Sequence, residues 1–224
     1  MKYIGQILTL FTMNKQPILI VSCGPGAPEY LTETARQAVS HAELLVGATR
    51  LLALFPDSTA QRCPVSGDLK AALETIETAY PEQKVVVLVT GDAGLHSFAR
   101  TIIQRFGRTH CQIISGISSV QVAFARLGLE WTNAQIISAH GITPSVTDES
   151  LATRIAILGG GKASWTAIEN IIEKCRATHA AFLCENLTLD NERVIALEDK
   201  RLSTLQPASL SIILLVNYGL IIDN

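Results

Sequence analysis

The chain has 224 residues, of which 48% are hydrophobic and 17% charged, and its formal net charge is −2. This length suffices for one large domain or two small ones, and the apolar content argues against a disordered chain. The near-neutral charge argues against broad binding to nucleic acid or to an anionic membrane surface. Five cysteines without C-x-x-C spacing favour reduced core thiols over a disulfide framework or a zinc site.

Neither end of the chain predicts a secretion signal or a membrane span. Residues 1–16 hold a short apolar stretch with no small-residue cleavage site behind it. The apolar run at 209–222 is shorter than a membrane span and is interrupted by Asn217 and Gly219. We therefore expect a cytoplasmic protein, and we interpret residues 1–12 as an extension that precedes an alternative start at Met13.

Strand and helix patterns alternate through the first half of the chain. Continuous apolar runs predict strands at 17–23, 43–47, 84–90 and 111–115. Helical spacing, with Thr32 as an N-cap and glycines closing the last two segments, predicts helices at 32–42, 49–56, 67–81, 94–107 and 118–128.

A second set of elements begins near Trp131. Strands are predicted at 134–141, 154–161, 179–186, 193–197 and 211–217, with one helix at 164–177. Alternating strands and helices predict α/β layers, and the last strands lack helix-length connections. We therefore expect an N-terminal α/β domain at 13–130 with a mainly parallel sheet. A C-terminal α/β domain at 131–224 should have a mixed sheet.

The first predicted strand ends in a turn that is a poor cradle for a pyrophosphate. A dinucleotide fingerprint requires G-x-G-x-x-G, and Gly24 and Gly26 are followed by Glu29 at the third position. The second strand ends in Gly47, where an acidic residue would bind a ribose. Pro25 also lacks an N–H group. These features disfavour NAD binding.

Two further catalytic motifs are incomplete. The run LGGGKA at 158–163 is no Walker A loop, because Ala156 and Ala163 stand where glycine and a hydroxyl residue are required. This run is either a flexible turn or a backbone that a ligand can approach closely. The run SGISSV is no nucleophile elbow, because Val120 stands where the second glycine is required.

No metal site is predicted from the histidines. The five histidines lack a ligand spacing such as H-x-x-x-H. His96 and His140 lie near predicted strand ends, where a functional residue would sit, but we interpret both as hydrogen-bonded structural residues.

Three glycine-containing turns follow strands of the first predicted sheet. They are SCGPG at 22–26, TGDAG at 90–94 and SGISS at 115–119. All three should lie at the carboxyl edge of one open sheet, where ligands bind in such folds. Small residues permit close backbone approach and Asp92 offers an acceptor, so this edge favours a neutral or zwitterionic, nucleotide-like ligand.

In order and spacing, these turns resemble the motifs of the tetrapyrrole methylases, which use S-adenosylmethionine. In that family a G-x-G-P-G turn follows the first strand, and a G-D-P motif and a P-G-[IV]-[ST]-[SA] motif come later. The counterparts here are SCGPG, GDAG and SGISS. The resemblance extends from about Pro17 over nearly all of the remaining chain.

Longer runs are similar to the branch of the family that methylates carbon 5 of a precorrin in cobalamin biosynthesis. They are LLVGATRLLALFP at 44–56, GISSVQVAFARLGLEW at 116–131, SAHG at 138–141 and ENLTLDNERV at 185–194. No segment resembles the decarboxylating C15 partner of fused relatives, so the resemblance implies a standalone C5 enzyme.

Three positions depart from the family pattern. Ala93 replaces the usual proline of G-D-P, and Ser22-Cys23 replaces the commoner glycine and small apolar residue before GPG. Leu187 follows the EN pair, where several relatives have glycine. Each departure could reshape the cofactor pocket, and none removes an obvious acid or base.

The resemblance implies S-adenosylmethionine bound in the cleft between two α/β domains, S-adenosylhomocysteine as the product, and a homodimer. It implies cofactor contacts from Pro25, Gly91, Asp92, Ala93, His96, Ser118, Ser119, Leu158, Gly159, Asn186 and Leu187. A substrate rich in carboxylates needs cationic anchors, and the candidates are Arg50, Arg100, Arg126 and Lys162, for which solvated helix surface is the alternative. Gly24 and Gly26 are expected to leave room for the macrocycle.

Methyl transfer from a sulfonium depends on alignment, which can contribute about 7–11 kcal/mol, so no catalytic base is assigned. The alternatives are a methyltransferase of the same fold acting on another precorrin position, on ribosomal RNA or on a modified histidine, and a non-catalytic nucleotide-binding module. The sequence leaves open the cobalt content of the substrate and an association with a C15 enzyme.

Overall fold

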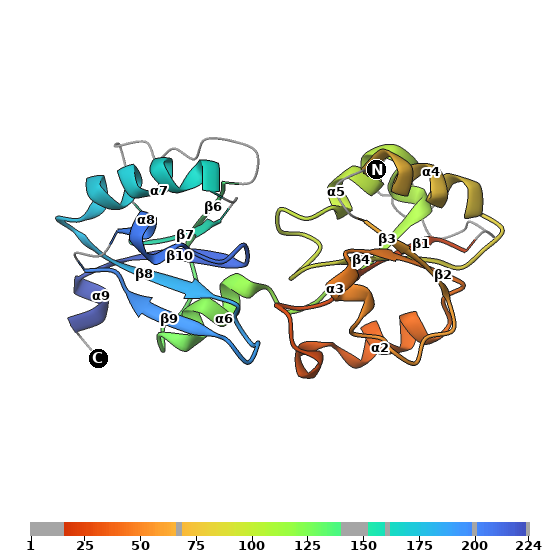
Figure 1. Ribbon diagram of the computed structural model, residues 1–224, viewed down its shortest axis with the longest axis horizontal. Helices are drawn as coiled ribbons and strands as arrows, with labels where there is room; N and C mark the ends of the chain where they lie inside the picture. Colours follow the sequence, from red (N-terminus) through yellow and green to blue (C-terminus); the bar gives the residue numbers. More distant parts are fainter. Residues whose placement is uncertain (1–15, 66–68, 140–151, 160–161, 199–200, 223–224) are drawn as a thin grey trace, which may run out of the picture. The chain divides into compact units, whose positions relative to one another are not determined.

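The computed structural model describes residues 16–65, 69–139, 152–159, 162–198 and 201–222 (Figure 1). The chain divides into two compact units, Met1–Ser118 and Ser119–Asn224. This division comes earlier than the predicted one at 130–131, because helix α6 (Ser119–Arg126) packs against strand β10 (Ser211–Asn217) of the second unit. The interpreted extension at 1–12, Met13 and His140 fall outside the described residues.

The first unit is built on a five-stranded sheet in which every pair of strands is parallel, in the order β3-β2-β4-β1-β5. Parallel strands are covered on both faces by helices, which explains why the central strands carry almost only apolar residues. The strands are β1 (Ile18–Ser22), β2 (Leu44–Gly47), β3 (Gln61–Pro64), β4 (Val85–Val89) and β5 (Cys111–Ile114).

Alternate residues of these strands pack into two separate cores. Ile20 and Val87 face helices α4 and α5, whereas Val21 and Leu88 face helices α2 and α3 (Figure 1). The side-chain period of two in a strand produces this alternation. The helical elements are η1 (Pro28–Tyr30), α2 (Glu33–Ser40), α3 (Thr49–Leu52), α4 (Leu69–Ala79), α5 (Ala99–Phe106) and η2 (Arg108–His110).

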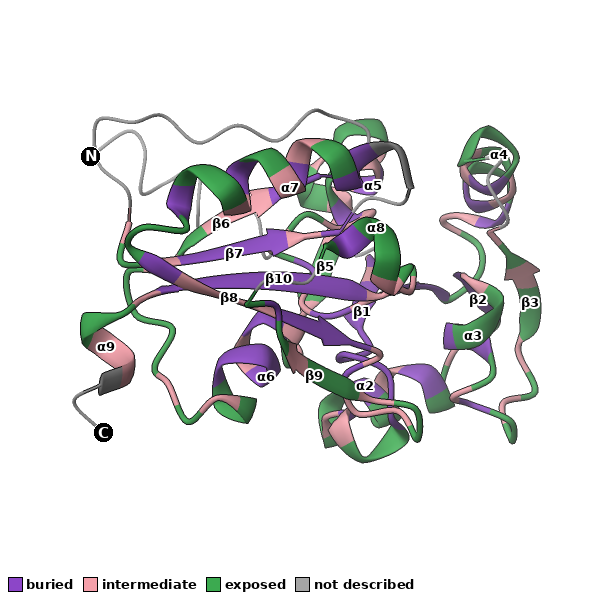
Figure 2. Ribbon diagram, turned by 60° about the vertical axis from the view of Figure 1, so that its left-hand side comes forward, coloured by how far each residue is buried: buried purple, intermediate pink, exposed green. Residues whose placement is uncertain are grey.

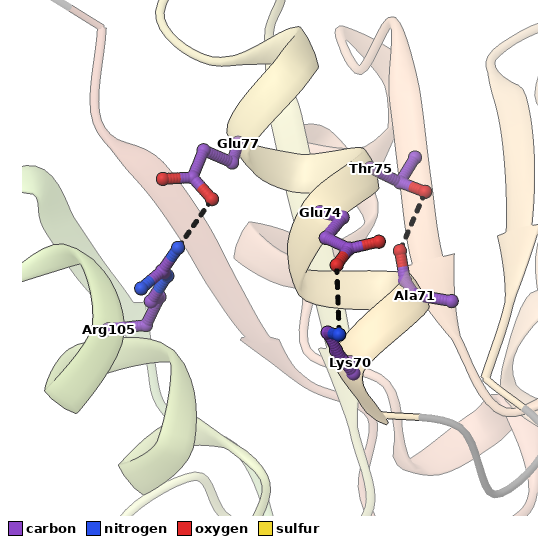
Figure 3. Close-up of polar contacts among 6 residues, drawn as sticks. All are labelled: Lys70, Ala71, Glu74, Thr75, Glu77 and Arg105. Carbon is purple, nitrogen blue, oxygen red and sulfur yellow. Dashed lines mark hydrogen bonds and ion pairs between the residues drawn. The ribbon is translucent and has the colours of Figure 1, made fainter.

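The outer sides of α4 and α5 carry charged residues that form ion pairs. Arg105 Nη2 of α5 lies 2.6 Å from Glu77 Oε2 of α4, and Lys70 Nζ lies 3.8 Å from Glu74 Oε1 (Figure 3). All four side chains are more than half exposed, so each pair adds little to stability. The two helices therefore gain their stability from the apolar sides that they turn toward the sheet.

The second unit is built on a five-stranded mixed sheet with the order β6-β7-β10-β8-β9. Only β6 and β7 are parallel, and β10 is antiparallel to both of its neighbours. Helices α7 and α8 cover one face, where Trp165, Ile168 and Leu202 meet the strands, and α6 covers the other. Beyond β10 and α6, the elements are β6 (Gln135–Ser138), β7 (Arg154–Leu158), α7 (Lys162–Cys175), β8 (His179–Glu185), β9 (Arg193–Ala196), α8 (Leu202–Leu205) and α9 (Gly219–Ile222).

The structure confirms the predicted fold class and each predicted strand, with the predicted bounds for β10 and shorter bounds for the others. Figure 2 shows that central strands such as β7 and β10 are buried, whereas edge strands such as β9 and β3 are largely exposed. The sequence missed β3, because an exposed edge strand shows no apolar run and Cys63 is its only apolar residue besides a terminal proline.

Helix α5 begins at Ala99, five residues after the predicted start at Gly94. Side chains hold the preceding residues in a turn: Gly94 N donates to Asp92 Oδ1 at 2.8 Å, and Ala99 N donates to Ser97 Oγ at 3.2 Å. Short polar side chains compete with helical hydrogen bonds in this way. No helix among the described residues is both long and apolar enough to cross a membrane.

Candidate functional site

The three glycine-containing turns lie side by side at one edge of the first unit's sheet. Strand β1 pairs with β4 on one side and with β5 on the other, all in parallel. The chain therefore leaves these three neighbouring strands at the same edge, as the sequence predicted. This is also the place where the connections diverge, since the chain passes from β1 toward β2 and from β4 toward β5 on opposite sides.

The backbone amides of the β1 turn are committed to the neighbouring turn. Cys23 N donates to Val89 O at 2.8 Å and Gly24 N donates to Gly91 O at 3.2 Å, while Gly91 N returns a bond to Gly24 O at 2.8 Å. Pro25 has no N–H group. The turn thus offers a ligand no amide from residues 23–25, which argues against a phosphate cradle and agrees with the failed dinucleotide fingerprint.

Glycine is required at both ends of this small bridge. Gly24 has φ +70° and Gly91 has φ +65°, a backbone region that L-residues rarely adopt. A Cβ atom on Gly24 would also stand 3.0 Å from Tyr30 O. Gly24 therefore serves the turn's own conformation and its packing on η1, while the expected role of Gly26 beside the substrate stays a prediction.

The carboxylate of Asp92 joins the β4 turn to the β5 turn. Its Oδ1 accepts from Gly94 N at 2.8 Å and its Oδ2 accepts from Gly116 N at 3.0 Å. Hydrogen bonds to a charged acceptor are stronger than neutral ones. The Asp92 carboxylate therefore holds the turn after β4 and the turn after β5 together, and this structural role does not depend on a contact with a ligand.

Two cationic side chains lie close to this edge. Arg50, in α3 just after β2, donates from Nη2 to the hydroxyl of Thr90 at the end of β4. Arg100 is exposed in the first turn of α5, and its guanidinium forms no hydrogen bond or ion pair with a residue in the described ranges. Both remain predicted anchors for substrate carboxylates.

The other predicted contacts of the first unit lie in the same turns. His96 is exposed, with φ +46°, in the turn before α5. Ser118 is buried after the β5 turn, and Ser119 begins α6 in the second unit. Cys23 lies under the β1 turn, and burial raises the pKa of its thiol to about 12, so this sulfur stays protonated at neutral pH.

In the second unit, the turn after β7 rests on an indole ring. Gly159 N donates to Ser211 O at 2.9 Å. A Cβ atom on Gly159 would stand 2.7 Å from Trp165 Cη2 and 2.9 Å from Ser211 O. The sequence left open whether this run is a flexible turn or a backbone that a ligand approaches, and the side of Gly159 that lacks a Cβ is filled by Trp165. The side chain of Lys162 lies outside the described part of this turn.

The turn after β8 contains Asn186 and Leu187. Asn186 has φ +48° and Thr188 has φ +74°, whereas Leu187 is not among the residues with positive φ. Leucine in place of the family's glycine is therefore free of backbone strain, and the Leu187 side chain is buried. The preceding residue, Glu185, is fully buried and accepts from Ala208 N at 2.7 Å.

An ion pair joins two of the sequence runs that carried the family resemblance. Arg126 of α6 donates to both carboxylate oxygens of Glu192, at 2.5 and 3.1 Å, and Glu192 also accepts from Thr188 N at 2.5 Å. Arg126 holds the pKa of Glu192 below its ordinary value. The guanidinium that was predicted to bind substrate is thus engaged by a carboxylate of its own chain.

The sequence analysis assigned no role to two polar residues of these turns, Ser22 and Glu192. Both lie within runs that carried the family resemblance, and the available signal was a polar residue at the end of a buried strand or in a short loop. Neither pattern reveals its partner, because Ser22 bonds to Ala93 and Glu192 to Arg126, far away in sequence.

A parallel α/β unit with three neighbouring turns at the carboxyl edge of its sheet, followed by a mixed α/β unit, defines a two-domain α/β fold. The family model for Tetrapyrrole (Corrin/Porphyrin) Methylases matches residues 17–201. The chain therefore belongs to that family.

Individual relatives are similar at modest identity. The cobalt-precorrin-7 C(5)-methyltransferase of Salmonella typhimurium is 28% identical over 178 residues, which cover 79% of this chain and 88% of that protein. The precorrin-6Y methylase of Archaeoglobus fulgidus matches with a TM-score of 0.69 at 23% identity, over 90% of this chain and 97% of that chain.

A second solved structure contains a ligand. The uroporphyrin-III C-methyl transferase of Thermus thermophilus, in complex with S-adenosyl homocysteine, matches with a TM-score of 0.71 at 17% identity. The match covers 89% of this chain and 92% of that chain. At these identities the two solved structures show a shared fold.

Proposed function

We propose that this chain is an S-adenosylmethionine-dependent methyltransferase that acts on carbon 5 of a precorrin or cobalt-precorrin in cobalamin biosynthesis. Family membership supports the reaction class, and the named activity of the Salmonella relative supports the substrate and position. The observation that carries the proposal is the joining of the three motif turns by the Gly24–Gly91 bridge and the Asp92–Gly116 bond.

The chemistry of this edge fits the proposed cofactor. When bound, S-adenosylmethionine supplies a methyl group on a positively charged sulfur, and S-adenosylhomocysteine is the product. The ligand carries no phosphate, and the amides of Cys23 and Gly24 are already bonded to backbone carbonyls. The turns therefore form a preorganised surface that can orient a ligand, and orientation is the main requirement of methyl transfer.

The proposed cofactor contacts come from the turns of each unit. In the first unit they are Pro25, Gly91, Asp92, Ala93, His96 and Ser118. In the second unit they are Ser119, Leu158, Gly159, Asn186 and Leu187. Among the substrate anchors, Arg50 and Arg100 come first, because Arg126 is already paired with Glu192. Lys162 and the space beside Gly26 complete the proposed substrate contacts.

The first test is ligand choice. Isothermal titration of the full chain with S-adenosylhomocysteine, NAD and ATP should show binding of S-adenosylhomocysteine and much weaker binding of the other two. Tighter binding of NAD or ATP would overturn the proposal. Because the test compares ligands on one protein, it does not depend on how much of the preparation is active.

The second test is the product. Turnover with S-adenosylmethionine labelled with carbon-13 in its methyl group, on metal-free and cobalt-loaded precorrin substrates, should add one labelled methyl group by mass spectrometry. Nuclear magnetic resonance should then place the label on carbon 5. A label on another ring carbon would support the methyltransferase activity and reject the assignment of carbon 5.

The proposed assembly is a homodimer, with a C15 methyltransferase as a possible further partner. Light scattering coupled to size exclusion should give twice the chain mass of 24.2 kDa. A monomer mass over the concentration range of the assay would reject the dimer without affecting the proposed reaction.

A further inference from the structure

The side chain of Ser22 is a buried hydroxyl at the end of an otherwise apolar strand. Ser22 is 1% exposed, and its Oγ accepts a hydrogen bond of 2.9 Å from Ala93 N. Ala93 lies in the turn after β4 and is itself 6% exposed. A buried N–H group left without an acceptor is costly, so this bond constrains where the β4 turn can lie.

A second serine binds the other backbone group of Ala93. Ser97 Oγ donates to Ala93 O at 2.6 Å. Serine side chains therefore hold both the N–H and the C=O of this one residue, which fixes the orientation of the peptide groups on either side. The Ala93 N–H has no capacity left for a ligand.

Ser22 also contacts the turn after β5. A Cβ atom built on Gly116 would stand 2.6 Å from Ser22 Cβ and 3.0 Å from Ser22 O, so the backbone of Gly116 lies directly against Ser22. The N–H of Gly116 is bonded to Asp92, the residue before Ala93. Ser22, at the end of β1, therefore contacts both the turn after β4 and the turn after β5, and Asp92 joins these two turns to each other.

We infer that Ser22 is a positioning residue, whose hydroxyl fixes the β4 turn in the conformation that binds the cofactor. The inference rests on the proposed function, since that turn carries the predicted contacts Asp92, Ala93 and His96. The same hydrogen bond determines which groups Ala93 can offer to the cofactor. With its N–H consumed by Ser22, Ala93 offers a van der Waals surface, which suits an uncharged part of an S-adenosyl ligand better than a phosphate.

A double-mutant cycle tests this role, with binding of S-adenosylhomocysteine by isothermal titration as the measurement. Ser22→Ala leaves the Ala93 N–H without an acceptor and should weaken binding about tenfold. Ala93→Pro removes the donor and leaves the serine hydroxyl unpaired. The double variant, which has neither orphaned group, should lose less binding free energy than the sum of the two single losses, because removing both partners of a bond can be nearly neutral.

A matched control separates positioning from general destabilisation. Ile76→Val removes one buried methylene from α4 in the core of the same unit, so it should lower the melting temperature and leave the affinity unchanged. Hydrogen exchange of the segment 91–97 without ligand should be faster in Ser22→Ala and unchanged in Ile76→Val.

The outcomes are distinguishable. If the unmodified chain binds S-adenosylhomocysteine and Ser22→Ala binds it equally well, the positioning role is overturned and the proposed function stands. If Ile76→Val weakens binding as much as Ser22→Ala does, the effect of Ser22 is general stability and the role is likewise overturned. If the unmodified chain fails to bind S-adenosylhomocysteine at all, the proposed function is overturned first.

Discussion

The two units hold the turns at their carboxyl edges by different means. In the first unit, polar side chains add to the Gly24–Gly91 backbone bridge: Ser22 accepts from Ala93 N, and Asp92 accepts from Gly116 N. In the second unit, backbone groups do much of the same work. Gly159 N donates to Ser211 O at 2.9 Å, and Asn186 N donates to Leu210 O at 2.9 Å.

Strand direction explains the difference. Where neighbouring strands are parallel, their chains leave the sheet at the same edge, so the amides of each turn lose the regular ladder partners. Backbone carbonyls accept from Cys23, Gly24 and Gly91, and side chains supply the acceptors for Ala93 and Gly116. In the second unit β10 is antiparallel to β7 and β8, and residues next to its start face the ends of both strands. Its turns can therefore rely on backbone bonds and on packing against Trp165.

The largest effect on stability should follow from removing the Trp165 side chain from the core of the second unit. Trp165 is buried in the core and supports Gly159, so Trp165→Ala should lower the free energy of unfolding by about 3–5 kcal/mol. The other tryptophan, Trp131, is 48% exposed, and Trp131→Ala should stay within about 0.5 kcal/mol of the unmodified chain. Urea denaturation followed by circular dichroism measures both. A cost for Trp165→Ala below that of Ser22→Ala would contradict the contrast between the units.

An intermediate effect should follow from crowding the polar edge of the first unit. Gly116→Ala places a Cβ atom 2.6 Å from Ser22 Cβ, and such overpacking costs about 1–3 kcal/mol. It should also weaken S-adenosylhomocysteine binding, because the Asp92 and Ser22 contacts must shift. In the control Gly128→Ala, the new Cβ meets no atom within 4 Å, and only the strain of φ +68° remains, about 1 kcal/mol. Equal losses of affinity in both variants would refute the edge-specific effect.

The smallest effect concerns the ion pair of the second unit and depends on pH. Arg126 keeps the pKa of Glu192 below its ordinary value of 4.5 in the folded chain. The ionised pair therefore stabilises the fold fully above that ordinary value, and the stabilisation is lost as the pH falls through the lowered pKa. Glu192→Gln should cost about 1 kcal/mol at pH 7 and nothing in strong acid.

The control for that prediction is the exposed pair in Figure 3. Glu77→Gln breaks the contact with Arg105, in which both side chains are more than half exposed, and should change stability by about 0.5 kcal/mol or less at any pH. Thermal melts of both variants between pH 3 and about pH 7 test the comparison. A pH-independent difference for Glu192→Gln would show that its charge is unimportant.

Much of the fold was predictable, because burial leaves a direct trace in the sequence. Strand β4, with five buried residues, reads as an unbroken apolar run, and α2 begins where Thr32 Oγ1 accepts from Ala35 N at 3.1 Å. The exposed edge strand β3 left no such trace. The boundary at Ser118 could not be predicted either, because the apolar face of α6 does not show which of the two sheets the helix will cover.

The sequence by itself determined the alternation of strands and helices, the glycine turns and their family resemblance, because each of these depends on neighbours within a few residues. Only the tertiary structure decided which polar groups meet. Ser22 and Ala93, noted separately as departures from the family pattern, are the two ends of one buried hydrogen bond between residues 71 positions apart. A proline at 93 would have no N–H to donate, and a glycine at 22 would have no hydroxyl to accept it. Such a pairing depends on the parallel neighbours β1 and β4, and no local pattern encodes it.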